Sequence, residues 1–400
     1  MRNLGTSSLI VAAFVGPGTV LTCAAAGVEF SYSLGWVLVF ATAAVFVLQS
    51  FTAGTGILAQ KGLGEAIRSI SSEKWFRLPL FMLVVLGLWI GTAAFETGNL
   101  IGASAGLEIL MGGYVDARWW SVGVAVAATV ILLRDVRLIR NLLTGLVALM
   151  GFFFIGAAAM SPIDWMSALK GLTIPSLPSE SLFTVTALVG TTVVTYNLFL
   201  HAAVTKIFWS GEPREESWKS ELRGMLIILP LGGIISLAIL LAGASASGQG
   251  LTVSEIGDFV RLLEPAAGDG AKYLFGLGLL AAGLTSAVTA PLAAAAGISE
   301  LFDWPRGPHG VRYRLLWGSV LVIGVLFSFT GISPLDIIIA AQAANGILLP
   351  LMAGILVYVT VKQKVFSLPW YYTVAGIAVV LFCALLGLKT LSWVWSQVGP

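Results

Sequence analysis

Long apolar runs separated by short polar loops make up almost the whole of this chain. Eleven of these runs have the length needed to cross a hydrocarbon layer about 30 Å thick. Their approximate bounds are 6–27, 34–59, 78–111, 119–133, 138–160, 183–205, 221–246, 271–297, 314–331, 334–360 and 371–388. The pattern predicts an all-α polytopic membrane protein in which residues 1–400 form a single membrane domain.

Two of the runs are interrupted near their middles. The first contains Gly16-Pro17-Gly18-Thr19, and the sixth contains Val194-Thr195-Tyr196-Asn197. Backbone groups freed at bilayer depth persist only where protein, water or a bound solute satisfies them, so paired breaks mark a candidate transport site. The alternative is that glycine and proline simply kink two packed helices.

The two breaks occupy corresponding places in two halves of the chain. Residues 161–182, rich in proline and serine, predict an outer loop that joins the halves. Five runs precede it and five follow it, which gives a first repeat at about 6–160 and a second at about 183–360. This is the inverted-repeat plan of many secondary transporters. The last run, 371–388, is then an additional helix.

Composition excludes several classes of protein. Hydrophobic residues form 58% of the 400 and charged residues only 10%, against about 25% charged in soluble domains. A net charge of +2 gives no basic surface for nucleic acid. The sequence has no phosphate-binding GxxxxGK[ST] motif, no HExxH and no cysteine cluster. We therefore expect neither an enzyme nor a bound cofactor.

The positive residues divide unequally between the two sides of the predicted bundle. Seventeen lie on the loops and tails of one side, and five lie on the other. Those five are Arg118, Lys170, Arg261, Lys272 and Lys389. The positive-inside rule then predicts a cytoplasmic N-terminus and, after eleven crossings, an outer C-terminus. The first apolar run begins almost at once and continues past its break, so we expect no cleavable signal. A bacterial-type plasma membrane is the expected location.

One outer loop has helical periodicity. Within residues 251–265, Ile256, Phe259, Val260 and Leu263 recur at helical spacing. This pattern predicts a short amphipathic helix lying at the outer membrane interface.

Two titratable residues inside the apolar runs are candidates for proton coupling. Glu96 stands deep in the third run, where a carboxylate must face water, carry a proton or pair with a cation. His201 lies one helical turn after Asn197 and could extend a polar path from the second break. The alternatives are a glutamate that serves helix packing and a histidine hydrogen-bonded between helices.

Four stretches of the sequence carry a family resemblance. They are Ala26-Gly27 with the following residues 30–36, Asn197-Leu198-Phe199-Leu200-His201, residues 278–283 with Ser286, and Gln342 with Pro350. Together they resemble the NRAMP (natural resistance-associated macrophage protein) family of proton-coupled divalent-metal transporters. The resemblance covers nearly the full length. It implies a LeuT-like 5+5 inverted repeat with broken helices 1 and 6 and a solute held near the midplane between spans one, six and ten.

The chain departs from the family pattern at the positions of the metal ligands. Alignment places the family's DPGN motif on Gly16-Pro17-Gly18-Thr19 and its MPH motif on Val194-Thr195-Tyr196. The family's acidic pair in the third span falls on Glu96 and Asn99. Val194 cannot ligate a metal, and no aspartate remains at position 16, so tight binding of a dehydrated transition metal is not expected.

Two kinds of solute fit these substitutions. A cation that keeps much of its water, as magnesium does, needs few direct ligands. A small anion such as bicarbonate, or a polar solute, could instead bind at the half-helix N-termini. In either case the expected contacts are Gly16, Gly18, Thr19, Val194, Thr195, Tyr196 and Gln342, and the candidates for proton coupling are Glu96, Asn99 and His201. A channel or a transport-dead sensor are further alternatives.

Overall fold

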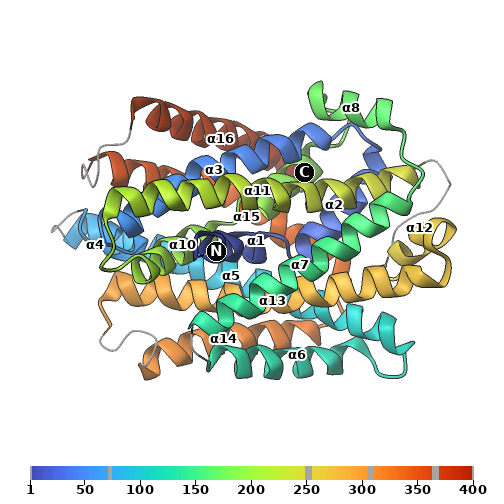
Figure 1. Cartoon of the computed structure of the whole chain (residues 1–400), viewed down its shortest axis with the longest axis horizontal. Coiled ribbons are helices and arrows are strands. Elements are labelled where there is room, and N and C mark those ends of the chain that lie inside the picture. The colour runs from blue at the N-terminus through green and yellow to red at the C-terminus, as the bar shows by residue number, and fades with distance from the viewer. Residues whose placement is uncertain are drawn as a thin grey trace.

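The computed structural model describes residues 2–70, 74–134, 136–247, 255–304, 310–362 and 369–398, and no strand occurs among them. Long helices lie side by side along the longest axis of the molecule (Figure 1). Short helices sit at the two ends, with α4 at the left of the view and α8 and α12 at the right. The predicted all-α architecture is confirmed.

The described residues form sixteen α-helices and one turn of 3-10 helix. In chain order they are α1 (Arg2–Phe14), α2 (Pro17–Phe30), α3 (Gly35–Ile57), α4 (Leu63–Arg68), α5 (Lys74–Met111), α6 (Ala117–Leu132), α7 (Val136–Met160), α8 (Trp165–Thr173), α9 (Leu182–Thr192), α10 (Thr195–Phe208), α11 (Arg214–Ser245), α12 (Asp258–Ala267), η1 (Gly268–Gly270), α13 (Ala271–Phe302), α14 (Val311–Ser328), α15 (Pro334–Lys362) and α16 (Trp370–Val398).

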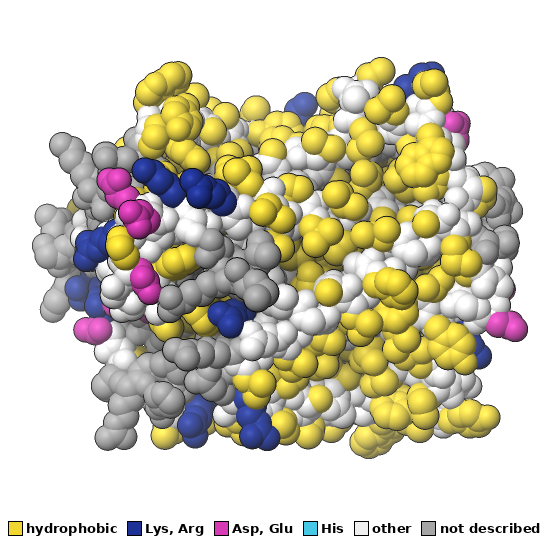
Figure 2. Space-filling model, viewed as in Figure 1, with side chains coloured by type: hydrophobic (Ala, Val, Ile, Leu, Met, Phe, Trp, Pro, Cys, Tyr) yellow, Lys and Arg dark blue, Asp and Glu magenta, His cyan; other side chains and the backbone are white. Residues whose placement is uncertain are grey.

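The helices account for the predicted membrane runs. Within the described part of the chain, nine stretches are long and apolar enough to cross a membrane, and the bent pair α1 and α2 makes ten. The fourth predicted run, at 119–133, forms α6, which has only 16 residues. Figure 2 shows a broad apolar surface over the middle and right of the bundle, with most of the visible Lys and Arg side chains toward the left.

The first break lies at Val15 and Gly16, slightly earlier than predicted, and residues 17–19, expected to be unwound, form the first turn of α2. α1 ends at Phe14 and α2 begins at Pro17, and the axes of the two helices differ by 55°. Gly16 has an extended backbone (φ −106°, ψ −174°) and is followed directly by proline at the first helical position. Proline has no N–H to lose there, and its fixed φ suits the start of a helix.

The second break lies slightly earlier than predicted. α9 ends at Thr192 and α10 begins at Thr195, so Val193 and Val194 are the interrupting residues. Residues 195–197, expected to be unwound, form the first turn of α10. The reason is a contact from a distant helix. Asn345 of α15 donates hydrogen bonds to the carbonyl oxygens of Gly190 (2.6 Å) and Val193 (3.1 Å), which satisfies the end of α9 at that position.

The segment 161–182 is not a simple loop, because it contains α8. Asp164 caps this helix by accepting hydrogen bonds from the N–H groups of Met166 and Ser167. The segment is also fastened to the corner between α2 and α3. The N–H of Asp164 donates to the hydroxyl of Tyr32 (3.0 Å), and the indole of Trp36 donates to the carbonyl of Ser176 (3.0 Å).

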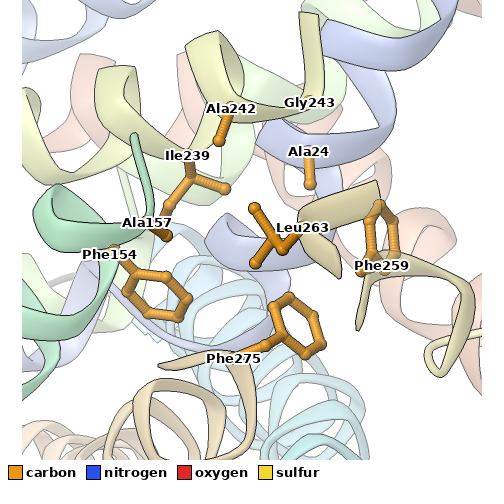
Figure 3. Close-up of a pocket in the computed structure, with 9 residues that line it drawn as sticks. All are labelled: Ala24, Phe154, Ala157, Ile239, Ala242, Gly243, Phe259, Leu263 and Phe275. Atoms are coloured by element: carbon orange, nitrogen blue, oxygen red, sulfur yellow. The ribbon is translucent and has the colours of Figure 1, made fainter. Parts of the chain in front are cut away.

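The predicted amphipathic helix exists in part as α12, although residues 251–254 lie outside the described residues. Its apolar face packs on the protein. Ile256, Phe259 and Leu263 are buried, and the ring of Phe259 stacks on that of Phe275 at 5.7 Å. Figure 3 shows Phe259 and Leu263 directed at an apolar cavity of about 20 Å³.

Candidate functional site

The last turn of α1 frees backbone carbonyl groups in the middle of the bundle, and other side chains of the protein satisfy them. The donors come from α2, α10 and α13. Asn197 Nδ2 donates to Ile10 O (3.0 Å), Ser286 Oγ to Ala12 O (3.4 Å), Tyr196 Oη to Ala13 O (3.0 Å), and Thr19 Oγ1 to Phe14 O. The first break is therefore held by direct hydrogen bonds from α2 and from two helices that are distant in sequence, α10 and α13.

Hydroxyl and amide groups also join the two breaks to each other and to α15. Thr19 of α2 and Thr191 of α9 share a hydrogen bond of 2.7 Å. Thr195, at the start of α10, donates to Asn345 Oδ1 at 2.8 Å. A small cavity of about 30 Å³ lies beside Thr195 and Asn345 and is also lined by Phe95. It has room for one or two waters.

Gly16 and Gly18 allow close approach of neighbouring side chains. A Cβ atom at Gly16 would lie 2.4 Å from Ser286 Oγ, and one at Gly18 would lie 2.0 Å from Gln342 Nε2. Both distances are well below van der Waals contact, so any side chain here requires its neighbour to move. The structure thus brings Gln342 directly against the first turn of α2.

The two helices that begin at the breaks lack side-chain caps. Gly16 and Val194 occupy the N-cap positions of α2 and α10, and neither makes a side-chain cap hydrogen bond. Ser, Thr, Asp or Asn at this position would accept a hydrogen bond from the first turn. Both helix N-termini therefore present partial positive charge toward the breaks.

Three buried oxygen atoms around the first break have no hydrogen-bond donor among the described residues. They are Gln342 Oε1, Asn197 Oδ1 and Glu96 Oε1. Gln342 packs on Gly18, and Asn197 is bonded through its amide nitrogen to the end of α1. A buried acceptor left without a donor costs about 1–3 kcal/mol, so each of the three requires an explanation.

Glu96 is fully buried on α5 and is connected to the break through Asn99. The side-chain amide of Asn99 donates to Glu96 Oε2 at 3.3 Å. The side-chain oxygen of Asn99, Oδ1, lies 3.6 Å from where a Cβ atom on Gly16 would be. The preceding residue, Phe95, packs edge-on against Tyr196 with ring centroids 5.4 Å apart. The structure therefore places Glu96, Asn99 and Tyr196 in one region.

His201 belongs to a separate buried cluster. Its Nδ1 atom lies 2.8 Å from Thr52 Oγ1 and 2.9 Å from Gln49 Oε1, and its Nε2 atom lies 3.3 Å from Glu221 Oε1. Glu221 also accepts hydrogen bonds from Thr6, Ser7 and Trp209. Sequence reasoning missed Glu221 because it stands at the edge of an apolar run, where a carboxylate is ordinarily solvated.

The ligands available at the breaks are oxygen atoms. Among the described residues, no group of three or more His, Cys, Asp or Glu side chains could hold a metal ion. Val194 contributes only a hydrocarbon side chain at the position between α9 and α10.

Comparisons with known proteins agree over most of the chain. A family model described as natural resistance-associated macrophage protein-like (Nramp) matches residues 7–392. The divalent metal cation transporter MntH of Klebsiella pneumoniae (strain 342) is 28% identical over 296 residues, covering 72% of this chain and 70% of that protein. MntH of Verminephrobacter eiseniae (strain EF01-2) is 26% identical over 409 residues, covering 96% and 89%.

Solved structures share the fold. The manganese transporter of Eremococcus coleocola, in complex with an aromatic bis-isothiourea substituted compound, superposes with a TM-score of 0.81 at 20% identity, covering 100% of this chain and 88% of that one. A nucleobase-cation-symport-1 family transporter with bromovinylhydantoin bound gives a TM-score of 0.63 at 15% identity, covering 99% and 93%. These likenesses confirm the predicted LeuT-like fold with broken first and sixth spans.

Proposed function

Since this chain belongs to the Nramp family, whose members are transporters and not enzymes, we propose that it carries a divalent metal cation that keeps part of its hydration shell. Magnesium is the model for such an ion, because it dehydrates reluctantly and is usually bound with several waters. The relatives named as divalent metal cation transporters favour a metal as cargo.

The observation that carries this proposal is the set of unpaired oxygen acceptors around the first break. Gln342 Oε1, Asn197 Oδ1 and Glu96 Oε1 are buried without a donor among the described residues. Water molecules bound to a cation present O–H groups outward, and these would donate to such acceptors. The carboxylate of Glu96 would supply counter-charge, and the lack of a thioether at Val194 accords with a hard ion.

The proposed mechanism is alternating access around the two breaks. Thr19, Thr195, Tyr196 and Gln342 are all buried, so the site lies inside the bundle and a conformational change must open it to each side. Glu96, with Asn99, is our candidate for carrying a coupled proton. His201 is hydrogen-bonded to Glu221 and not to the residues of the breaks. If His201 carries protons, it does so within the cluster formed with Glu221, Thr52 and Gln49.

The proposed orientation follows the charge distribution. With 17 Lys and Arg on one side and five on the other, the N-terminus is placed in the cytoplasm and the C-terminus outside, in a bacterial-type plasma membrane. In this orientation α4 lies on the cytoplasmic side and α8 and α12 lie outside.

A second candidate cargo is a small anion such as bicarbonate or another small polar solute. The specific observation in its favour is the absence of side-chain caps at Gly16 and Val194, which leaves the N-termini of α2 and α10 available to negative charge. The buried carboxylate of Glu96 disfavours this candidate unless it is protonated.

Uptake into proteoliposomes tests the proposal. We expect saturable magnesium flux that shows countertransport and is weakened by Gln342→Ala, whereas Gln60→Ala on a loop outside the site leaves it unchanged. Saturable bicarbonate flux without metal flux would replace the first candidate with the second. Flux that is linear in the gradient and shows no exchange would indicate a channel, and no flux of either solute would contradict both candidates.

A further inference from the structure

The hydroxyl of Tyr196 donates a hydrogen bond to a backbone carbonyl oxygen in the last turn of α1, just before the first break. Its Oη atom donates to Ala13 O at 3.0 Å, and the side chain is 2% exposed. The ring is held edge-on by Phe95 at 5.4 Å. A buried phenol ordinarily finds a hydrogen-bond partner, but here its partner is one of the carbonyl groups that a broken helix would otherwise offer to a cation.

The carbonyl oxygens on either side of Ala13 also accept hydrogen bonds from hydroxyl groups. Ser286 donates to Ala12 O at 3.4 Å, and Thr19 donates to Phe14 O. A hard cation binds carbonyl oxygens directly at about 2.0–2.6 Å. An ion at that distance from Ala13 O would compete with the hydroxyl hydrogen for the same oxygen. A carbonyl oxygen has two lone pairs, so an ion bound there would share the oxygen with the hydroxyl hydrogen, whose partial positive charge repels the ion and weakens direct coordination at this helix end.

We infer that Tyr196 determines the specificity of the site by capping Ala13 O, which disfavours cations that bind through direct carbonyl coordination and favours cations that keep their water. This inference rests on the proposed function. The acceptors Gln342 Oε1 and Asn197 Oδ1 have no donor among the described residues and remain available to water ligands, while the carbonyl oxygens at the end of α1 already accept side-chain hydrogen bonds.

The phenylalanine variant isolates this role. Tyr196→Phe keeps the edge-on contact with Phe95 and removes only the donor, so Ala13 O becomes an unpaired acceptor. Tyr313→Phe is a matched control. Tyr313 is also a buried tyrosine whose hydroxyl donates to a helix carbonyl, that of Leu292 at 3.4 Å, and it lies on α14, away from both breaks.

The experiment is titration of purified full-length protein with Mg²⁺ and with Mn²⁺ by calorimetry. Manganese serves as the probe that gives up water more readily. We expect Tyr196→Phe to raise the affinity for Mn²⁺ relative to Mg²⁺ about tenfold, the equivalent of about 1.4 kcal/mol. Tyr313→Phe should leave this ratio at the wild-type value.

A second variant keeps the test decisive if Tyr196→Phe does not fold. Ser286→Ala frees the adjacent Ala12 O and should shift the ratio in the same direction. Wild-type protein that binds Mg²⁺, with an unchanged ratio in the folded variants, would overturn the inference and leave the proposed function standing. Wild-type protein that binds neither cation would overturn the proposed function itself.

Discussion

Asn99 donates a hydrogen bond of 3.3 Å to Oε2 of Glu96, one turn earlier on α5. The other carboxylate oxygen of Glu96, Oε1, has no donor among the described residues. The pair lies between the break and α14, where a Cβ atom at Gly324 would meet the Glu96 side chain at 3.0 Å. No basic side chain forms an ion pair with Glu96 in the described part of the chain. Its charge must therefore be balanced by cargo or by a proton.

We expect Glu96→Gln to abolish coupled proton movement while exchange of the cargo continues, because glutamine keeps the shape and the hydrogen bonding but cannot release a proton. A pH-sensitive dye inside proteoliposomes measures the first quantity, and isotope exchange measures the second. Glu108→Gln, three turns later on the same helix and partly exposed, is the control. Acidification that is unchanged in Glu96→Gln would remove this residue from the mechanism.

Gly16→Asp introduces the carboxylate that the family motif carries, but the position has no room for it. The new Cβ atom would lie 2.4 Å from Ser286 Oγ. We expect thermal unfolding to show a loss of about 1–3 kcal/mol, the usual cost of overpacking. Combining it with Ser286→Ala removes the nearest atom and should recover part of that loss. Two changes whose effects simply add would show that Ser286 is not the obstacle.

Glu221 holds the N-terminal half of the first span to the rest of the bundle. It accepts hydrogen bonds from Thr6 (2.6 Å) and Ser7 (3.0 Å) of α1 and lies 3.3 Å from His201 of α10. Glu221→Ala removes a buried acceptor that α1, α10 and Trp209 share, so we expect a loss of stability of about 1–3 kcal/mol. Thermal unfolding measures it, with the exposed Glu216→Ala on the same helix as control. A loss similar to that of the control would mean that the cluster contributes little.

The sequence predicts features that depend on local backbone chemistry. Gly16 and Pro17 fix the first break because an extended glycine followed by a proline dictates where a helix starts. The second break lies earlier than the sequence predicts because its position depends on Asn345, about 150 residues away, which satisfies the end of α9. No local signal distinguishes Val193 from Thr195 as the unwound residue.

The contrast between local signals and contacts between distant helices also explains which other features the sequence predicts. The packing of α12 on α13 depends on the stacking of Phe259 on Phe275, a contact between helices that periodicity cannot reveal. The bond between His201 and Glu221 likewise joins two helices. By contrast, α8 has a local signal within its segment, since Asp164 followed by Ser167 and an apolar pattern is typical of a helix N-terminus.

The cap of α8 gives a prediction about pH. Hydrogen bonds from the Ser167 hydroxyl and N–H, and from the Met166 N–H, lower the pKa of Asp164 from its ordinary value. A carboxylate with a lowered pKa contributes stability above its unfolded pKa and loses it as the pH falls through the folded pKa. We expect the segment 161–182 to become sensitive to an acid-active protease below about pH 4. Asp164→Asn should remove most of this pH dependence, and a variant that keeps it would show that other groups release the segment.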